Sequence, residues 1–470
     1  MLIRDVIAQK VQDALAQTEY PAKTPVQTAL EHPQNPEHGD YATSLPLRLS
    51  RSWGINPLKI AQNIASLVKC GDELESVNAA PPGFVNFSLK LGWLQEQVDS
   101  IISAGEHYGE VNDGQGQRVQ VEFVSVNPTG PIHVGHTRGA ILGSAMAKLL
   151  QTAGYEVSCE YYINDAGNQM NLFYESLYAR YKQEFGQESD FPTDGYLGTY
   201  IRTLAKEIKT EFGRHFLDLP EGEGSIQLGK LGLQKMLAYI RKDLESIGVR
   251  FDVWFSESDL YTSGQYEKIL AMLHDGGYLV QRDGATWFSS EILGEDKDAV
   301  LVRSTGIPTY FASDVAYHYN KLKVRKFDRA VNIWGADHQG HVGRVKAAIA
   351  ALGLDQSRLH IAITQMVSLK RGSEAVRVSK RTGELITLRD LVDDVGSDAC
   401  RFLFLARSPE AQMEFDMELA VHQSMDNPVY YVQYAHARIA GILRQARERG
   451  ISYLEGDVRL LTGTEEQGLV

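Results

Sequence analysis

Apolar and polar positions follow two different periods near the start of the chain. Between residues 3 and 15 apolar side chains recur every three or four positions, which predicts an amphipathic helix. A second helix is expected from Asn56-Pro57 onward, because Asn is a favoured N-cap and Pro suits the first helical position. Between residues 85 and 89 apolar and polar residues alternate, as in a strand with one face in solvent. These patterns predict a small α+β module.

A polar, glycine-rich stretch at residues 111–117 ends this module, and a different pattern follows it. Residues 119–126 are typical of a strand, residues 134–153 of a long helix closed by Gly154, and residues 157–163 of a second strand. A strand, a helix and a strand in so short a span predict a right-handed parallel crossover. We therefore expect a doubly wound α/β sheet to begin here.

The rest of this sheet is expected further along the chain. Residues 165–250 are mostly helical and polar, and we interpret them as an insertion into the sheet. Strand and helix patterns resume at residues 249–254, 330–334 and 359–363, which supply the second half of the sheet. From about Leu388 the pattern becomes helical and stays so to the end.

Composition narrows the class of protein. The 470 residues are 43% apolar and 23% charged, which is typical of a globular chain with about three domains. No stretch approaches the roughly 20 apolar residues of a membrane span, and the first residues lack the apolar core of a secretory signal. The cysteines Cys70, Cys159 and Cys400 are too far apart to predict a disulfide framework or a paired zinc site. We therefore expect a cytoplasmic protein with no membrane segment and no protein-bound metal.

The net charge of the chain affects whether it can bind a nucleic acid. Lys and Arg number 47 against 60 Asp and Glu, which gives a net charge of −13. A nucleic acid would have to be held by a local basic patch, because the chain as a whole repels phosphate. Taken alone, this charge argues mildly against binding of RNA or DNA.

Residues 127–136 carry the most chemical information, because they lie where a predicted strand passes into a helix. Sheets of this kind bind their ligands there. His133 and His136 face the same way at a helix N-terminus, whose free N–H groups and dipole favour a polyphosphate. Gly135 between them leaves room for a purine or a ribose. A structural histidine pair or half of a metal site is the alternative, and the spacing alone gives it equal weight.

A basic segment lies far downstream, at residues 377–384. Arg377, Lys380 and Arg381 place three cations within five residues, close to Gly383. Such a loop can stabilise charge that develops on a departing pyrophosphate, and the glycine allows it to move. By itself, a solvated basic turn is the favoured interpretation.

Together the two segments resemble the two signatures of class I aminoacyl-tRNA synthetases, here His133-Val134-Gly135-His136 and Val378-Ser379-Lys380-Arg381. Further motifs resemble arginyl-tRNA synthetases and extend the resemblance over nearly the whole chain. These motifs are Val121-Glu122-Phe123 and residues 38–43, 251–257, 334–338 and 427–436.

Two features depart from the family pattern. Arg377-Val378 stands where Lys-Met is usual, so only the second lysine of that signature, Lys380, is retained. The chain also stops at Val470, although the helical anticodon-binding domain of the family continues further, so we expect a truncated or shortened member. The resemblance implies an N-terminal tRNA-contacting module at residues 1–112, a Rossmann-type catalytic domain at 113–390 and a helical segment at 391–470.

The resemblance implies activation of L-arginine by ATP to arginyl-adenylate, followed by transfer to the terminal adenosine of tRNA(Arg). No protein nucleophile is needed, because such a transfer depends on positioning and on charge stabilisation at phosphate oxygens. Mg²⁺ is expected to accompany ATP through its phosphates. The residues assigned to catalysis by this resemblance are His133, His136 and Lys380. Those assigned to ATP are Gly135, Gly335, Asp337, Arg377, Ser379 and Lys380.

Arginine selection requires carboxylates, because a planar guanidinium is best held by bidentate acceptors, which a lysine ammonium cannot match. The resemblance assigns this task to Glu122, Asn127, Tyr310, Asp314 and Asp337. Asn127 is expected to hold the main-chain groups of the substrate. Tyr310 and Asp314, four apart at a predicted helix start, are expected to hold the guanidinium. For Glu122 and Asp314 an ordinary salt bridge or a helix cap is the alternative.

The resemblance also implies tRNA(Arg) as a partner, and a need for tRNA before arginine is activated. Tyr41 in the N-terminal module is assigned to stacking on a tRNA base, with a place in the local core as an equal alternative. Tyr434 is assigned to tRNA as well, but for the cluster of Tyr430, Tyr431, Tyr434 and His436 core packing is favoured over base stacking. We expect a monomer.

Two other functions remain open at this point. A small nucleotidyltransferase uses a similar histidine pair on a similar sheet, but the chain is longer than such an enzyme needs. A non-catalytic synthetase-like regulator would account for Arg377-Val378 and the early stop, whereas the retained His133, His136 and Lys380 argue against it.

Overall fold

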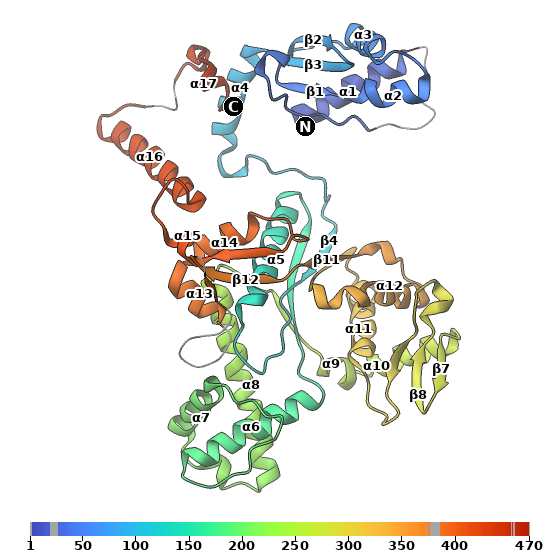
Figure 1. Cartoon of the computed structure of the whole chain (residues 1–470), viewed down its shortest axis with the longest axis vertical. Coiled ribbons are helices and arrows are strands. Elements are labelled where there is room, and N and C mark those ends of the chain that lie inside the picture. The colour runs from blue at the N-terminus through green and yellow to red at the C-terminus, as the bar shows by residue number, and fades with distance from the viewer. Residues whose placement is uncertain are drawn as a thin grey trace. The chain divides into compact units, whose positions relative to one another are not determined.

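The computed structural model describes residues 2–18, 27–372, 374–376, 386–452, 454 and 456–469. The chain forms two compact units, whose helices and strands are labelled in Figure 1. The first unit comprises Met1–Tyr108 together with Gly441–Val470, and the second comprises Gly109–Ala440. No helix in the described ranges has both the length and the apolar character needed to cross a membrane.

The first unit contains an antiparallel sheet in the order β1-β3-β2, with helices packed against it. Its strands are β1 (Tyr41–Thr43), β2 (Leu74–Ala80) and β3 (Phe84–Leu89). Its helices are α1 (Ile3–Ala16), α2 (Leu45–Trp53), α3 (Pro57–Leu67), α4 (Leu91–Ala104) and α17 (Thr464–Gln467). The predicted cap of α3 is confirmed, because the side chain of Asn56 accepts hydrogen bonds from the N–H groups of Leu58 and Lys59.

The second unit is built on five parallel strands in the order β11-β10-β4-β5-β6. They are β4 (Arg118–Glu122), β5 (Glu156–Ile163), β6 (Val253–Ser256), β10 (Arg329–Gly335) and β11 (Leu359–Thr364). Helices α5 (Val134–Thr152) and α12 (Val342–Ala351) follow β4 and β10. This order of strands and helices confirms the predicted doubly wound sheet.

Strand β4 is shorter than predicted. It ends at Glu122, whereas the sequence pattern predicts a strand as far as Val126. Val124 and Ser125 have positive φ angles of 69° and 43°, a conformation that side chains rarely adopt and that is incompatible with a strand. The chain therefore leaves the sheet directly after Glu122, at the start of the segment that leads to the histidines.

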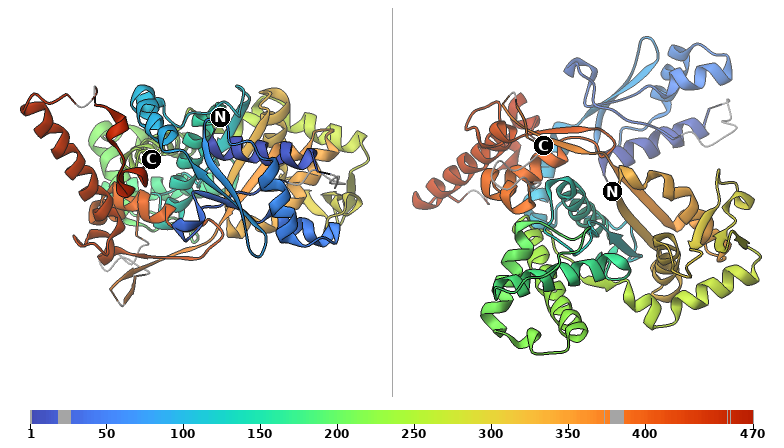
Figure 2. Two further views of the ribbon diagram at one scale, coloured as in Figure 1. Left: turned by 90° about the horizontal axis from the view of Figure 1, so that it is seen from above. Right: turned by 60° about the horizontal axis from the view of Figure 1, so that its bottom comes forward.

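The expected helical insertion lies between β5 and β6. It consists of α6 (Asn168–Glu184), α7 (Thr199–Phe212) and α8 (Glu221–Ser246), which pack against one another. Figure 2 shows these helices in green as one group at the side of the sheet. Strand β6 follows this group and begins at Val253, four residues later than predicted.

A second group of elements lies between β6 and β10, and apart from the helix start at Tyr310 the sequence pattern does not predict it. It contains α9 (Ser258–Thr262), α10 (Gln265–Asp275), an antiparallel sheet of β7 (Leu279–Arg282), β8 (Ala285–Phe288) and β9 (Ala299–Val302), and α11 (Tyr310–Tyr319). Helix α11 continues into a π-helical segment, Asn320–Val324. Each strand has only four residues, too few for a clear period of two to stand out.

The prediction of helices from Leu388 to the end is wrong at one place. Helices α13 (Leu388–Val395), α14 (Ser397–Leu405), α15 (Met417–Val421) and α16 (Pro428–Glu448) are present. However, β14 (Met413–Asp416) interrupts them and pairs with β12 (Val367–Arg371), which also pairs with β13 (Glu374–Val376). A strand of four residues is stabilised by a partner distant in the sequence, so a local pattern does not reveal it.

At Gly143, helix α5 packs closely against Phe123, the residue that follows β4. A Cβ at Gly143 would lie 2.2 Å from the ring of Phe123, which is 1% exposed. Gly143→Ala should therefore destabilise the second unit by about 1–3 kcal/mol, more than the roughly 1 kcal/mol that alanine adds as a helix former.

The apparent Tm from thermal unfolding checks this expectation. Gly139→Ala on the same helix is the matched control, since its nearest neighbour is a methyl group of Ile333 at 3.9 Å. Equal Tm values for the two variants would contradict the packing argument.

Candidate active site

The two predicted histidines form a contacting pair at the N-terminal end of α5. His133 is the N-cap residue, and its Nδ1 accepts a hydrogen bond of 3.1 Å from the N–H of Gly135. His136 lies in the first turn, and the centroids of the two rings are 3.8 Å apart. A Cβ on Gly135 would lie 2.9 Å from the His133 ring, so this close approach requires a glycine.

Burial keeps both imidazoles neutral near pH 7. It lowers the pKa of His133, and it lowers the pKa of His136 to about 4, where the neighbouring His133 adds to the effect and Asp337 opposes it. Since Nδ1 of His133 is an acceptor, its Nε2 carries the proton and can donate to a ligand. The pair therefore presents hydrogen-bond donors, and positive charge has to come from the helix dipole and from basic side chains.

Residues 386 and 387, which follow the basic segment in the sequence, lie beside this histidine pair. Arg377, Ser379 and Lys380 themselves lie outside the described residues. Just after them, Thr387 forms a β-bridge with His133, and the N–H of Val134 donates to the carbonyl of Ile386 over 3.0 Å. The residues that follow the second predicted signature are thus hydrogen-bonded to the residues of the first signature, at the start of α5.

Gly335 and Asp337 lie at the same edge of the sheet as the histidines. Gly335 is the last residue of β10, and β10 runs parallel to β4 as its neighbour. A Cβ on Gly335 would lie 2.5 Å from Oδ1 of Asp337, which folds back over it. The carboxylate of Asp337 is exposed and lies 3.4 Å from Nε2 of His338.

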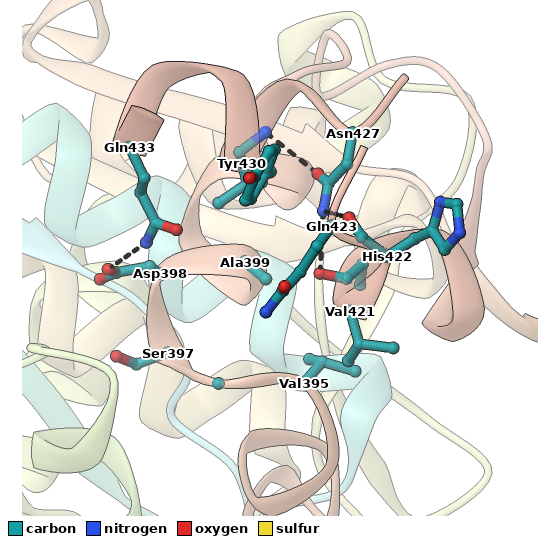
Figure 3. A pocket seen from close by; sticks show the side chains of 13 residues that line it. Val395, Ser397, Asp398, Ala399, Val421, His422, Gln423, Asn427, Tyr430 and Gln433 are labelled. Atoms are coloured by element: carbon teal, nitrogen blue, oxygen red, sulfur yellow. Dashed lines mark hydrogen bonds between the residues drawn. The ribbon is translucent and has the colours of Figure 1, made fainter. Parts of the chain in front are cut away.

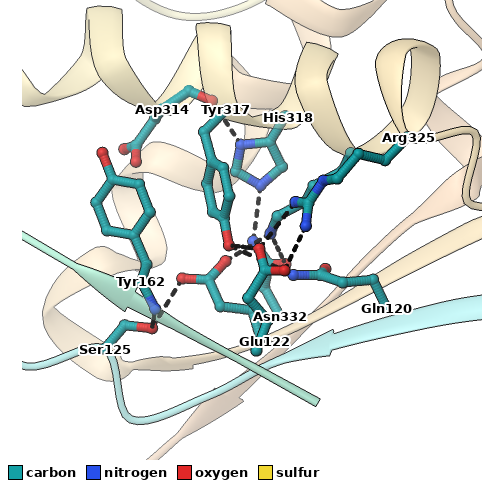
Figure 4. Close-up of polar contacts among 11 residues, drawn as sticks. Gln120, Glu122, Ser125, Tyr162, Asp314, Tyr317, His318, Arg325 and Asn332 are labelled. Atoms are coloured by element: carbon teal, nitrogen blue, oxygen red, sulfur yellow. Dashed lines mark hydrogen bonds and ion pairs between the residues drawn. The ribbon is translucent and has the colours of Figure 1, made fainter. Parts of the chain in front are cut away.

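Three carboxyl groups gather at this edge on different elements: Glu122 at the end of β4, Glu257 directly after β6 and Asp314 on α11. Oε2 of Glu257 is buried without a hydrogen-bond partner, and so is the hydroxyl of Tyr162, among the residues that the structure describes. Figure 4 shows the carboxylate of Asp314 directed toward this hydroxyl. Ser313 and Tyr162 lie close enough to Glu257 to lower its pKa, but no cation among the described residues forms an ion pair with Glu257 or Asp314.

The electrostatics of these acids follow from their burial. Burial, together with the nearby carboxylates of Glu122 and Glu257, raises the pKa of Asp314 to about 8, and Lys321 opposes this rise. Burial also raises the pKa of Glu257. A cationic group placed among them would lower both pKa values and restore the charge of the acids.

Glu122 differs from the other two acids because it already has a cation. Its Oε2 lies 2.5 Å from Nζ of Lys321, and its Oε1 accepts a hydrogen bond of 3.0 Å from Oγ of Ser125. The salt bridge that is the alternative role for Glu122 is therefore present. For Asp314 neither alternative is found, since the N-cap of α11 is Thr309 and none of the described cations pairs with Asp314.

Asn127 and Tyr310 are more exposed than the acids. Asn127 follows β4, and its Oδ1 accepts a hydrogen bond of 2.9 Å from Nδ2 of Asn164. Tyr310 is the first residue of α11 and 56% exposed, one turn away from Asp314 on the same helix face. Tyr310 lies near Glu257, since burial and then the charge of Glu257 raise the pKa of its hydroxyl, whereas the side-chain contact of Asn127 is with Asn164.

Three residues of this region are absent from the sequence-based assignment. Glu257 ends one of the motifs that carry the family resemblance, and that motif is the signal that could have identified it. Lys321 follows an almost continuous run of buried residues that begins at Phe311, so a lysine there is unexpected. For Tyr162, on the buried strand β5, no sequence signal distinguishes it from a core residue.

The two tyrosines assigned to tRNA are each described within their own unit. Tyr41 is half-buried on β1, packs on the core of the first unit and lies with its ring centroid 4.4 Å from that of His32. Tyr434 is 48% exposed on α16, beside Tyr431 at 52%. The expectation of core packing for this cluster is therefore wrong for Tyr431 and Tyr434, because about half of each side chain is exposed, although the ring of Tyr434 stacks on that of Tyr430 with centroids 6.4 Å apart.

Two further features do not add a site. None of the described residues form a group of three or more His, Cys, Asp or Glu side chains that could hold a metal ion. A pocket of about 400 Å³ lies where α14, α15 and α16 meet, and Figure 3 shows its lining. Its polar side chains bond to neighbours, as in the 3.0 Å hydrogen bond from Gln433 to Asp398.

Comparisons with known proteins give a consistent result. Residues 97–439 match the family described as "tRNA synthetases class I (R), catalytic domain", and residues 3–89 match "Arginyl tRNA synthetase N terminal domain". The chain is 50% identical to an arginine–tRNA ligase of Dehalococcoides mccartyi over 100% of its own length and 85% of the relative. It is 44% identical to one of Bacillus licheniformis over 99% of its length and 84% of the relative.

Solved structures show the same kinship. A putative arginyl-tRNA synthetase from Campylobacter jejuni is 34% identical, with a TM-score of 0.72 over 80% of this chain and 81% of that one. Arginyl-tRNA synthetase from Thermus thermophilus, 21% identical, has the same fold, with a TM-score of 0.77 over 99% of this chain and 85% of that one. Given the two matched domains and the identity over the whole chain, it belongs to the arginyl-tRNA synthetases, a family of class I aminoacyl-tRNA synthetases.

Proposed function

We propose that the chain activates L-arginine with ATP and transfers the arginyl group to the terminal adenosine of tRNA(Arg). The observation that carries this proposal is the pair of acids with raised pKa values and no cation partner, Asp314 and Glu257, at the sheet edge that also bears the histidine pair. A guanidinium supplies the cation that these acids lack, and the N-terminus of α5 supplies N–H groups for a polyphosphate.

The two chemical steps need positioning and no protein nucleophile. An oxygen of the arginine carboxylate attacks the α-phosphorus of ATP, the bond from that phosphorus to its bridging oxygen breaks, and pyrophosphate leaves. A ribose hydroxyl of the tRNA then attacks the carbonyl carbon of the adenylate, and AMP leaves. The proton on Nε2 of His133 is available to the phosphate oxygens during the first step, with His136 packed behind it.

Arginine is held by groups on three sides of the cluster. Asp314 and Glu257 take the guanidinium, whose planar fork suits two carboxylates, and Tyr310 closes over it from the start of α11. Asn127 holds the main-chain groups, and Glu122 adds negative charge behind Asp314. Lysine is rejected because its ammonium leaves part of this acceptor set buried and unpaired, so no editing step is required.

ATP is placed by the two predicted signatures and by the end of β10. Gly135, Gly335 and Asp337 take the adenosine, and the basic residues Arg377 and Lys380 with Ser379 take the phosphates. Mg²⁺ accompanies ATP through its phosphate oxygens.

The remaining assignments concern tRNA and the cell. We assign tRNA(Arg) contact to the N-terminal module at residues 1–112 through Tyr41, and to the helical segment at 391–470 through Tyr434. Catalysis belongs to residues 113–390. The exposure of Tyr434 supports stacking on a base, which requires an accessible ring face. We propose that the protein acts as a monomer in the cytoplasm.

The first prediction is the substrate specificity itself. ATP–pyrophosphate exchange, measured with each of the twenty amino acids and with tRNA(Arg) present, should occur with arginine alone, and the tRNA should then accept arginine. Exchange without attachment would place the defect in the tRNA-contacting parts. No exchange in a folded protein that binds ATP would instead favour a nucleotidyltransferase or a non-catalytic regulator.

The second prediction concerns Asp314. Asp314→Asn removes a charge that faces the guanidinium, so the KM for arginine should rise roughly a hundredfold, as expected for a charged hydrogen bond worth about 3 kcal/mol, while the KM for ATP stays within a factor of three. Asp275→Asn, at an exposed carboxylate on α10, is the control and should change neither constant. Small and equal effects of Asp314→Asn on both constants would exclude the role.

The third prediction is a pH dependence of arginine binding. Asp314 must be ionised to hold a guanidinium, and its pKa is about 8 in the free protein. The KM for arginine should therefore fall as the pH rises from 6.5 and level off above pH 8, with a slope that approaches tenfold per pH unit on the acidic side. The KM for ATP is the internal control, and a KM for arginine that stays constant from pH 6.5 to 8.5 would contradict this expectation.

A further inference from the structure

A fully buried lysine connects two of the proposed arginine-binding acids. Lys321 is 0% exposed and lies in the π-helical segment that continues α11. Its Nζ donates to Oε2 of Glu122 over 2.5 Å and to Oδ1 of Asn332 over 2.9 Å. π-Helical segments are uncommon and often accompany functional sites, because the wider turn redirects side chains. Here the wide turn directs a lysine beneath the sheet edge that bears Glu122.

The chain of hydrogen bonds continues from Asn332 back to α11. Nδ2 of Asn332 donates to Nε2 of His318 over 2.7 Å, and Nδ1 of His318 donates to the backbone carbonyl of Asp314 over 2.7 Å. The direction of each bond is determined, because the carbonyl of Asp314 can only accept. His318 is then a neutral ring, in agreement with the lowering of its pKa by burial. Figure 4 shows this chain of contacts between the acids.

We propose that Lys321 is a positioning residue for arginine recognition. It holds Glu122 directly and, through Asn332 and His318, holds the turn of α11 that carries Asp314, so that the two acids keep their separation and orientation before arginine binds. This inference rests on the proposed function, since it assigns Lys321 a task in that same site.

The neighbouring ion pair of Arg325 with Glu160 already joins this helical segment to the sheet, so Lys321 is not needed for that contact alone. Arg325, four residues after Lys321, pairs with the buried Glu160 on β5 and so supplies an equivalent contact between the same helical segment and the sheet. Both oxygens of Glu160 are satisfied, since Arg325 donates to each of them and the hydroxyl of Tyr317 donates to Oε1. Only the Lys321 pair ends at the acidic cluster.

The charge of Lys321 also acts on Asp314 through space. The titratable groups around Asp314 lie on several elements. Among the groups that shift its pKa, Lys321 is the cation, and it lowers the pKa that the neighbouring acids raise. These titratable groups are Glu122 on β4, Tyr162 on β5, Glu257 and Tyr261 at α9, and His318 and Lys321 on α11 and its extension. Loss of the lysine charge therefore raises the pKa of Asp314 further, which a merely packing role would not do.

The experiment compares Lys321→Met with Arg325→Met in tRNA-dependent ATP–pyrophosphate exchange. Both variants remove one cation of a buried pair, so both should have a lower Tm than the unchanged protein. Lys321→Met should raise the KM for arginine roughly tenfold or more at pH 7.5, which corresponds to a rise of about one unit in the pKa of Asp314. The pH at which the KM for arginine levels off should also become higher. Arg325→Met should leave the KM for arginine and its pH profile within a factor of two.

A second variant keeps the test decisive if Lys321→Met does not fold. Asn332→Asp is nearly isosteric and keeps an acceptor for Lys321, but it removes the donor to Nε2 of His318 and competes with Glu122 for the lysine. Both changes weaken the chain of contacts from Lys321 to Asp314, so the arginine pH profile should shift in the same direction. Equal arginine profiles for Asn332→Asp, Arg325→Met and the unchanged protein would overturn the role of Lys321. The unchanged protein measures the proposed function in the same assay, and its failure to exchange with arginine would overturn that proposal instead.

Discussion

The parallel pairing of five strands is the constraint on which the candidate site depends. Because β11, β10, β4, β5 and β6 all run the same way, their carboxyl ends meet at one edge. Residues far apart in the sequence therefore converge there: Glu122, His133 and Gly335, with Glu257 after the insertion. An antiparallel arrangement of the same strands would divide these side chains between two edges.

Some of the buried charges at this edge have partners of opposite charge and others do not. Buried charges without partners are costly, and the molecule satisfies some of them internally, as in the pairs of Lys321 with Glu122 and Arg325 with Glu160. It leaves Asp314 and Glu257 without such partners, with raised pKa values. In the site that we propose for arginine, a guanidinium would supply the cation that these two acids lack, whereas a neutral side chain would not.

Local patterns were sufficient where an element carries its own signal. The amphipathic spacing of α1, the cap of α3 by Asn56 and the alternation in β3 are all present as predicted, because each depends on neighbours in the sequence. The pattern failed at β14 and at the end of β4. The first depends on pairing with β12, and the second on the positive φ angles of Val124 and Ser125, and neither is visible in hydrophobic periodicity.

The sequence by itself determined the family, the strands and helices of the central sheet and the two signature segments, because these are properties of residue identity and spacing. Only the tertiary structure decided which acids have partners. It showed that Glu122 is paired with Lys321, that Glu257 joins Asp314, and that the histidine pair is neutral. The physical reason is that burial and the distances between charges set pKa values and pairing, and both arise only when distant segments pack together.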